Sequence, residues 1–510
     1  MAAIVKSFAI SGVDGYLVEV ETDTIYGKPS TTIVGLGDTA VKEARERLQA
    51  SLNCPEFQFP KMKVVINLAP SDIKKSGSHF DLAMAISLLM HSEQLETEQI
   101  ETFGFIGELS LNSYLRPCSG VLPMVIAARD AGVENIVVPK GNIREASLVT
   151  GINVYGFETL QEVCSFLSGE TTYEAQESCV ESYEEAALLD FDEVQGQDAI
   201  IEYIVVAAAG GHNALMIGAP GCGKSMIAKR IPTILPDLSE AEALETTKIY
   251  SVAGLLKNRG RLIESRPFRA PHHNASINSL IGGGNNAAPG EISLAHNGVL
   301  FLDEIAEFNK KALDSLRQPM EDKKVTVARV KFNNTYPCNF MLVAAMNPCP
   351  CGYYGQEKCR CSDYEVLKYR QRISGPIIDR IDIQKYVQPV PFMELSSFTR
   401  GSSSVELREQ VEAARSFQRQ RFAGIDDVHC NAQMTPALVK EYCRLEPEGE
   451  KVLKLAFERF EYSARSFHKF LKVARTFADM EESARIRRKD IAAALMARDL
   501  EKEQLEMLVV

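Results

Sequence analysis

The sequence predicts a multidomain α/β protein with a helical C-terminal part. The chain has 510 residues, which is enough for about three domains of ordinary size. Apolar stretches of strand length alternate with apolar stretches of helical character up to about residue 395, and beyond it only helical periodicity remains. Hydrophobic residues make up 45% of the chain and charged residues 24%, as in soluble globular proteins.

Composition excludes several classes of protein. No apolar run reaches the ~18–20 residues that cross a bilayer, so we expect no membrane partner. The first residues, MAAIVKSFAISGVDG, contain no apolar segment followed by a cleavage site. We therefore expect a cytoplasmic protein whose 12 cysteines are thiols or metal ligands rather than disulfides. The net charge of -12 excludes a basic surface over the whole molecule, but not a local basic channel.

Residues 1–168 are predicted to form a mixed α/β domain. KVVINLA (63–69) and NIVVPKG (135–141) are typical of short apolar strands, and FDLAMAISLLMH (80–91) and LPMVIAARDAG (122–132) of apolar helices. The segment 169–188 is rich in glutamate and lacks periodicity, so we interpret it as an acidic linker. A solvated helix is the alternative.

A second α/β domain is predicted at 189–395, and it contains the strongest motif of the chain. ALMI (214–217) is typical of a buried strand, GAPGCGKS (218–225) has the spacing G-x-x-x-x-G-K-[ST], and MIAKRI continues as a helix. In such a loop the backbone N–H groups face phosphate oxygens, Lys224 reaches the β- and γ-phosphates, and the Ser225 hydroxyl binds Mg²⁺. The predicted nucleotide-binding residues are Gly218, Ala219, Pro220, Gly221, Cys222, Gly223, Lys224, Ser225 and Met226.

Two further strands end in polar residues. GVLFLDEI (298–305) places Asp303 where it can hold the magnesium ion, and Glu304 where it can polarise an attacking water. FMLVAAMN (340–347) ends in Asn347, which can orient that water at the ligand-binding edge of an open sheet. The alternatives are an acidic helix cap after the first strand and a turn asparagine before Pro348 in the second.

These motifs, together with SGPIIDRIDI and SARSFHKFLKVARTFADM, resemble those of AAA+ ATPases. RPFRAPHHNAS (266–276), GEISLAHNGVLFLDEIAEF (290–308) and LRQPMEDKKVTVAR (316–329) are more specific. They resemble the magnesium-chelatase-like group and, within it, the ComM/YifB competence-related ATPases, over nearly the whole chain. The resemblance implies ATP and Mg²⁺ as cofactors, an AAA+ core at 189–395 and a helical lid at 396–510.

The same resemblance implies roles for two arginines. Arg380 in DRID would enter the ATP site of a neighbouring subunit, with Arg372 as the alternative for this role. Arg465 in SARSF would contact the γ-phosphate bound to its own subunit. Both roles agree with a reaction that is catalysed mainly by charge around the γ-phosphate. For either residue alone, a surface salt bridge is the alternative.

A basic hairpin is predicted between the catalytic strands. VTVARVKF followed by NN alternates like a β-hairpin and carries Lys323, Lys324, Arg329 and Lys331. In this AAA+ branch such a hairpin projects toward the pore of a ring, most often a hexamer. A second insertion, at about 248–295, contains a Gly-rich segment and the basic residues Lys257, Arg259, Arg261, Arg266, Arg269, His272 and His273. Both elements predict contact with single-stranded or branched DNA, and solvated charges with intersubunit ion pairs are the alternative.

The N-terminal domain has a resemblance of its own. KSGSHFDLAMAISLL (75–89) and GVLPMVIAARDAGVENIVVPKGN (120–142) resemble the proteolytic domain of Lon-type proteases, which use a Ser–Lys pair. His79 falls where the serine would be, and Leu122 falls where the lysine would be. Without an activated nucleophile there is no acyl transfer, so we predict a Lon-like (S5-type) fold without protease activity.

Four cysteines lie close together in NPCPCGYYGQEKCRC (347–361). Cys349, Cys351, Cys359 and Cys361 form two C-x-C pairs, and four thiolates suit a tetrahedral, structural Zn²⁺. Reduced structural cysteines and a redox pair are the alternatives.

The sequence as a whole predicts an ATP-hydrolysing ring motor that acts on DNA. The resemblance implies a branch-migration helicase in natural transformation or recombination. The alternative is an ATP-driven remodeller of a protein partner, of magnesium-chelatase type, although the Lon-like domain argues against the chelatase subunit itself.

Overall fold

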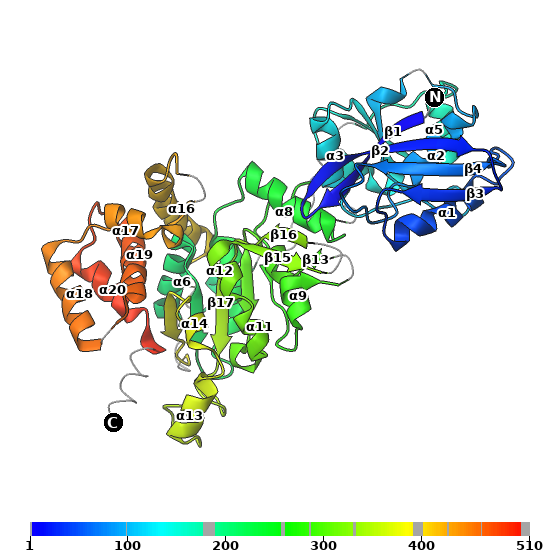
Figure 1. Ribbon diagram of the computed structural model, residues 1–510. Coiled ribbons are helices and arrows are strands. Elements are labelled where there is room, and N and C mark those ends of the chain that lie inside the picture. The colour runs from blue at the N-terminus through cyan, green and yellow to red at the C-terminus, as the bar shows by residue number, and fades with distance from the viewer. Residues whose placement is uncertain are drawn as a thin grey trace.

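The computed structural model describes residues 3–97, 99–176, 189–256, 261–284, 287–329, 333–390, 401–425, 428–460 and 462–500. Figure 1 shows an N-terminal α/β region, a central region built on a sheet, and a helical C-terminal region arranged in a row. The predicted multidomain α/β class with a helical C-terminal part is therefore confirmed. Within the described residues, no helix is both long and apolar enough to cross a membrane.

The N-terminal domain is built on a seven-stranded mixed sheet with the order β3-β4-β2-β1-β5-β8-β9. Its strands are β1 (Ala3–Ser11), β2 (Asp14–Ile25), β3 (Ser30–Val34), β4 (Lys63–Ala69), β5 (Phe103–Phe105), β8 (Asn135–Pro139) and β9 (Asn153–Phe157). Its helices are α1 (Thr39–Ser51), α2 (Asp81–His91), α3 (Val121–Asp130), α4 (Ile143–Ala146) and α5 (Leu160–Leu167), and β6 (Glu108–Leu109) pairs with β7 (Leu115–Arg116). The four elements that the sequence predicted here are confirmed.

The N-terminal domain extends beyond residue 168, where the linker was predicted to begin. The ring of Tyr173 lies 4.8 Å from that of Phe157, and the backbone N–H of Gln176 donates to the carbonyl of Val154. The predicted linker therefore starts later than its composition indicated, because an aromatic residue in an otherwise polar stretch packs on the domain. The remainder of that linker, 177–188, lies outside the described residues.

The central domain is built on a five-stranded parallel sheet with the order β11-β14-β17-β10-β18. Its strands are β10 (Ala214–Ile217), β11 (Phe268–Arg269), β14 (Val299–Leu302), β17 (Met341–Met346) and β18 (Ile383–Tyr386). Its helices are α6 (Asp198–Gly210), α7 (Lys224–Ile234), α8 (Glu240–Val252), α9 (Ile277–Ile281), α10 (Glu291–Leu294), α11 (Lys310–Asp314), α12 (Arg317–Asp322), α13 (Asp363–Arg370) and α14 (Gly375–Ile378). Every residue of β10, β14 and β17 is buried, as expected for strands covered on both faces.

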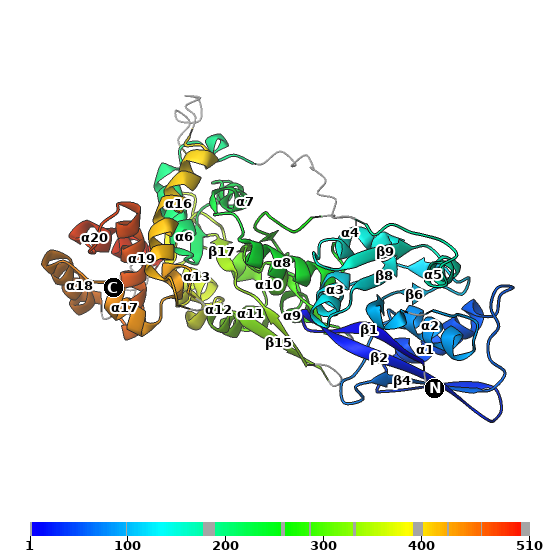
Figure 2. The same cartoon turned by 90° about the horizontal axis from the view of Figure 1, so that it is seen from above.

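Two small antiparallel hairpins interrupt this domain. The predicted basic hairpin is confirmed as β15 (Lys324–Ala328) paired with β16 (Asn333–Pro337). The Gly-rich insertion forms a shorter pair, β12 (Gly282–Gly283) with β13 (Ala288–Pro289). The Tyr336 hydroxyl donates to the carbonyl of Ala287 at 2.8 Å, so the two hairpins contact each other. Figures 1 and 2 place them on the side of the central domain that faces the N-terminal domain.

The contacts that dock the N-terminal domain on the central domain include an apolar and a polar group. In the turn between β1 and β2, Val13 packs against the apolar cluster of the central sheet, and Asp14 pairs with Lys248 of α8 at 3.1 Å. The second contact is polar and buried: the Ser251 hydroxyl donates to the Glu145 carboxylate at 2.5 Å. Burial raises the pKa of Glu145 above its usual value, although hydrogen bonds from Ser251 and from the Leu122 backbone oppose this.

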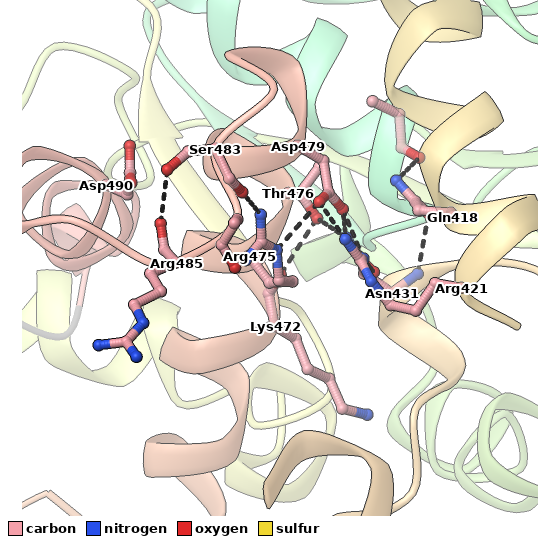
Figure 3. A network of polar contacts seen from close by, with 12 residues as sticks. Gln418, Arg421, Asn431, Lys472, Arg475, Thr476, Asp479, Ser483, Arg485 and Asp490 are labelled. Atoms are coloured by element: carbon pink, nitrogen blue, oxygen red, sulfur yellow. Dashed lines mark hydrogen bonds and ion pairs between the residues drawn. The ribbon is translucent and has the colours of Figure 1, made fainter. Parts of the chain in front are cut away.

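The C-terminal region consists of α16 (Ser404–Arg421), α17 (Pro436–Tyr442), α18 (Pro447–Phe460), α19 (Ala464–Met480) and α20 (Arg488–Met496). Figure 3 shows the buried polar network that fixes α19. The Asp479 carboxylate accepts from Arg421 at 2.8 Å, Arg475 at 2.9 Å and Asn431 at 2.7 Å. Because α16 carries Arg421, this network holds α19 against α16 and thereby sets where the first residues of α19 lie.

Candidate active site

Three parallel strands bring the predicted nucleotide residues to one edge of the central sheet. Ile217 of β10 lies opposite Met346 of β17, and Leu302 of β14 lies opposite Ala344. The residues that follow these strands therefore emerge together. The Lys224 ammonium lies 3.4 Å from the Asn347 side-chain oxygen, and the Ser225 hydroxyl donates to the Asp303 carboxylate at 2.7 Å.

The loop at 218–223 has the backbone conformation that its glycines allow. Gly221 and Gly223 have φ values of +79° and +91°, in the left-handed region that favours glycine. The Lys224 ammonium donates to the carbonyl of Gly218 at 2.7 Å and to that of Ala219 at 3.0 Å. The amine is therefore held over the loop, where it can contact the phosphates of a bound nucleotide.

Sequence reasoning missed a residue that supports this loop. The Gln197 side-chain amide donates to the carbonyl of Cys222 at 3.2 Å and to that of Gln388 at 2.8 Å. It therefore links the loop to the segment that follows β18. A glutamine ahead of a helix matches no motif, so only the folded chain reveals this contact.

Glu304, the predicted base, lies just beyond β14 and is exposed. Its backbone has φ +50°, and its N–H donates to the Asp303 carboxylate at 3.0 Å. The His273 ring nitrogen Nδ1 lies 3.6 Å from the Glu304 carboxylate, and the rings of His272 and His273 are 4.0 Å apart. His273 is therefore a second residue that the sequence did not assign to this site.

Arg380 and Arg465 both pair with the carboxylate of Glu321, which is distant from each of them in the sequence. Arg380 pairs with Glu321 at 2.9 Å, and Arg465 pairs with the same oxygen. Burial raises the pKa of Glu321, but Arg380 and Arg465 outweigh this and hold it below its usual value. Both arginines line a cavity of about 880 Å³ between the central domain and α19. Among the residues that the structure describes, the lining of this cavity includes none of 218–225.

Arg465 pairs with Glu321 in the single chain, and its contact with a γ-phosphate stays a prediction. Arg465 begins α19, and the Asp479 network together with a 2.8 Å hydrogen bond between His212 and Thr476 fixes the direction of that helix. The guanidinium consequently meets Glu321 beside Arg380 and not the phosphate-binding loop of its own chain. Arg372, the alternative to Arg380, binds both oxygens of Glu307 at 2.7 and 2.8 Å.

The basic residues predicted to bind DNA fall into two groups. Lys324 and Arg329 are exposed on the β15–β16 hairpin, and Arg329 donates to the Asn278 side chain at 2.6 Å. Lys323 lies between α12 and β15 with φ +56°, and its side chain is half-buried, whereas that of Lys324 is exposed. Both lysines line the cavity that contains Arg380. Burial lowers the pKa of Lys323. The contact of Lys323 with DNA stays a prediction, and Lys331 lies outside the described residues.

Two arginines of the second basic insertion also point inward. Arg266 donates to the carbonyl groups of Pro236 at 2.5 Å and Asn297 at 2.7 Å. Arg269 binds both oxygens of Glu291 at 2.7 and 2.8 Å. These bonds hold the insertion in place, and the contact of the two arginines with DNA stays a prediction. Lys257 and Arg259 lie outside the described residues.

The four cysteines form a compact cluster directly after Asn347. The sulfur atoms of Cys349, Cys351, Cys359 and Cys361 all lie within 4.8 Å of one another. Three of the separations are 3.3, 3.9 and 3.7 Å, and tetrahedral zinc with Zn–S bonds of about 2.3 Å gives a separation of about 3.8 Å. Hydrogen bonds from the Arg360 and Tyr353 backbones lower the pKa of Cys351 to about 6. Although backbone hydrogen bonds oppose this, burial and hydrogen bonds with the neighbouring thiols raise the pKa of Cys359 and raise that of Cys361 to about 12, so the cluster by itself favours one thiolate.

The Lon-like segment of the N-terminal domain contains no nucleophile paired with a base. His79 is 8% exposed, and burial lowers its pKa to about 4, so the ring is neutral at physiological pH. The hydroxyl of the nearby Ser78 donates to the Glu108 carboxylate rather than to a lysine. Leu122 is fully buried in α3.

Comparisons with known proteins cover the chain in succession. The family model "Magnesium chelatase, subunit ChlI" matches 190–395, "Subunit ChlI of Mg-chelatase" matches 20–142, and "Magnesium chelatase, subunit ChlI C-terminal" matches 401–498. The competence protein ComM of Haemophilus influenzae is 39% identical over 501 residues, which is 97% of this chain and 96% of that protein. YifB of Escherichia coli is 38% identical over 501 residues, 98% and 97% of the two chains. The Lon protease of Treponema pallidum is 26% identical over 171 residues, 31% of this chain and 19% of the protease.

The geometry around Glu304 generates a prediction for nucleotide turnover. Glu304→Gln is expected to bind ATP with nearly unchanged affinity, because Lys224, Ser225 and Asp303 are intact, and to hydrolyse it at least ~100-fold more slowly, because the base is lost. Phosphate release and nucleotide binding would be measured on the same preparation. Glu307→Gln is the matched control, since Glu307 is also exposed and lies three residues further along the chain. Normal turnover by Glu304→Gln would mean that another group activates the water.

Proposed function

The chain belongs to the magnesium-chelatase-like family of AAA+ ATPases that includes ComM and YifB, and from this we propose that it is an ATP-driven ring motor that moves along DNA. The observation that carries the proposal is the separation of two groups of residues. Lys224, Asp303 and Glu304 lie at the edge of the central sheet, whereas Arg380 and Arg465 lie at a separate cavity. In a ring, the arginines of one subunit can reach the nucleotide held by the next.

The residues at the sheet edge have the chemistry that ATP hydrolysis requires. The backbone N–H groups of 218–224 and the Lys224 ammonium bind the phosphates, and Ser225 and Asp303 hold Mg²⁺. Mg²⁺ supplies positive charge that neutralises the charge developing on the phosphates. Glu304 accepts a proton from the attacking water, and Asn347 orients that water. Lys224 and Ser225 begin α7 directly after the loop, and Asp303, Glu304 and Asn347 follow the buried strands β14 and β17, so their positions are defined before the nucleotide binds.

We infer that both arginines serve the neighbouring subunit. In the single chain, Arg380 and Arg465 both pair with Glu321, whose single charge balances only one of the two guanidinium groups. In a ring the γ-phosphate of the neighbour is the competing anion for the same two guanidinium groups. This assignment replaces the role in its own subunit that the resemblance implied for Arg465, and Arg372 is already bound to Glu307.

The exposed hairpin supports DNA as the substrate. Lys324 and Arg329 are exposed on β15–β16, and ring assembly would repeat them around a central opening together with Lys331. Repetition turns a few charges per chain into a strong local field, even though the net charge of the chain is -12. A relative with 39% identity is named a competence protein. We therefore propose single-stranded or branched DNA as the partner, a hexamer as the active form, and branch migration in natural transformation or recombination as the role.

The four-cysteine cluster is proposed to hold one structural Zn²⁺. Three of the sulfur separations, 3.3 to 3.9 Å, are close to those of tetrahedral coordination, and all four sulfurs lie within 4.8 Å of one another. Four protein ligands leave no position for substrate, so the metal would cross-link the loop and take no part in hydrolysis. We also propose that the N-terminal domain has a Lon-like fold. It is expected to lack protease activity, because His79 and Leu122 occupy the positions of the Ser–Lys pair of Lon-type proteases.

The proposal for DNA generates a prediction for the hairpin. Replacing Lys324, Arg329 and Lys331 together by alanine is expected to weaken binding to branched DNA and to abolish strand movement, whereas ATP hydrolysis without DNA persists. The dependence of affinity on salt should also become shallower by roughly one unit for each phosphate contact that is lost. The control variant replaces Lys440, Lys451 and Lys454, three exposed lysines of the C-terminal region, and so makes the same change in net charge. If the hairpin variant moved branched DNA normally, remodelling of a protein partner would be the better account.

The role of the arginines generates a prediction for mixed assemblies. Arg380→Ala and Arg465→Ala are each expected to bind ATP and to lose hydrolysis, by about 10³-fold for an arginine that acts between subunits. Lys224→Ala is expected to lose nucleotide binding. Mixing Arg380→Ala with Lys224→Ala should restore part of the activity, because some interfaces then combine an intact loop with an intact arginine. No recovery on mixing, together with a loss of hydrolysis in Arg372→Ala, would transfer the role to Arg372.

The proposed zinc site is tested by measuring the metal content of the purified protein. Protein purified without chelator is expected to contain about one zinc per chain by elemental analysis, and its four clustered thiols should react slowly with a thiol reagent in the folded state. Cys54 and Cys164, which are half-buried in the N-terminal domain, serve as internal controls for thiol reactivity. Absence of zinc combined with rapid reaction of all four thiols would contradict the proposal.

A further inference from the structure

The loop that carries the four cysteines, residues 349–361, rests directly on the phosphate-binding loop. Gly352 has φ +85°, and a Cβ built on it would lie 2.7 Å from Cδ and 2.9 Å from Cγ of Pro220. Contacts that short do not occur for real Cβ atoms, so the backbone at residue 352 approaches the Pro220 ring this closely only because the residue is glycine. The N–H of Gly352 donates to the carbonyl of Cys349 at 3.0 Å, which closes a turn around the first two cysteines.

The same loop is anchored to the sheet by a buried cation. Arg370 of α13 is 3% exposed, and its Nε donates to the carbonyl of Pro348 at 3.3 Å. It also donates to the Tyr386 hydroxyl of β18 at 3.0 Å, and its guanidinium lies 5.1 Å from the centre of the Tyr354 ring. The start of the loop and Tyr354 within it are therefore held against the central domain, and the turn at Gly352 faces Pro220.

The cysteines decide whether that turn keeps its shape. Seven residues separate Cys351 from Cys359, and the loop between them contains two glycines, Gly352 and Gly355. No helix or strand lies within 349–361, so its own backbone gives little resistance to movement. A metal held by the four thiols converts this segment into a cross-linked unit, and the unit holds the turn against Pro220.

We propose that the four-thiol loop is a positioning element for the nucleotide site, so that occupancy of the thiols by metal sets the affinity of the P-loop for ATP. The inference rests on the proposed nucleotide site and zinc site, and it adds a mechanical link between them. Pro220 lies between Gly218 and Gly221, whose backbone must be held in place to present its N–H groups to phosphate oxygens. The contact between Gly352 and the Pro220 ring keeps this short segment in the conformation that binds phosphate.

Two glycines of the same loop provide a matched pair of variants. Gly352→Ala introduces a methyl group against Pro220, whereas Gly355→Ala, at φ +81°, meets nothing within 4 Å. Both substitutions carry the same left-handed backbone strain, so their difference reports the contact with Pro220. Zinc content, thermal unfolding and the Kd for a fluorescent ATP analogue with Mg²⁺ would be measured for the full-length chain.

The expected result separates metal binding from nucleotide binding. Gly352→Ala should keep about one zinc per chain and weaken nucleotide binding by about tenfold or more, because small displacements at a binding site have large effects. Gly355→Ala should bind nucleotide with a Kd within about twofold of that of the natural chain. This is a small change in binding free energy, because a tenfold change in Kd corresponds to about 1.4 kcal/mol. Equal affinities of the two variants would overturn the inference.

Metal removal provides the second arm. Stripping zinc with a zinc-selective chelator, followed by restored Mg²⁺, should raise the nucleotide Kd of the natural chain and have little further effect on Gly352→Ala, because both changes act through the same contact. Unchanged affinity of the stripped natural chain would overturn the inference and leave the proposed function intact. If the natural chain loaded with zinc bound no nucleotide at all, the proposed function itself would fail.

Discussion

The parallel pairing of β10, β17 and β14 is the constraint on which the rest of the molecule depends. It gathers a phosphate-binding loop, a pair of carboxylates and an asparagine that are more than a hundred residues apart at the extremes. The opposite end of the same sheet is also fixed by specific hydrogen bonds. Asn213, just before β10, accepts from the Leu342 backbone at 2.8 Å and donates to the carbonyl of Arg380 at 3.0 Å. One sheet thus defines the position of the nucleotide loop and of the turn that carries Arg380.

The C-terminal helices are tied to this turn through buried charges. Asp382 accepts from the Asn213 backbone at 3.3 Å and lies 3.4 Å from the His212 ring, whose other nitrogen is bonded to Thr476 of α19. Burial opposes ionisation of Asp382, but His212 and Lys469 outweigh it and hold the pKa of this carboxyl well below its usual range. A charged Asp382 therefore links the Arg380 turn to α19. This contact explains why Arg465 and Arg380 meet at the same carboxylate although they are 85 positions apart in the sequence.

The features that could be predicted from the sequence are those that depend on a pattern of consecutive residues. The apolar runs of β4, β10, β14 and β17, the glycine spacing at 218–225 and the alternation in β15 each identify a local structure without knowledge of the fold. The contacts of Arg465, Lys323 and His273 could be found only from the folded structure. The position of Arg465 depends on how α19 packs, and Lys323 differs from Lys324 only because the backbone turns into the left-handed region between α12 and β15. His273 reaches Glu304 because a strand of two residues, β11, pairs beside β14.

The docking of the β1–β2 turn and of Glu145 on the central domain has a consequence for the modularity of the chain. Leu244 of α8 packs into the N-terminal core, and Val13 packs into the central one, so each domain completes a hydrophobic surface of the other. A chain shortened to begin at residue 189 would retain every motif of the proposed nucleotide site and would expose Leu244 to water. The part of the chain that carries these motifs therefore relies on the N-terminal domain to complete its surface.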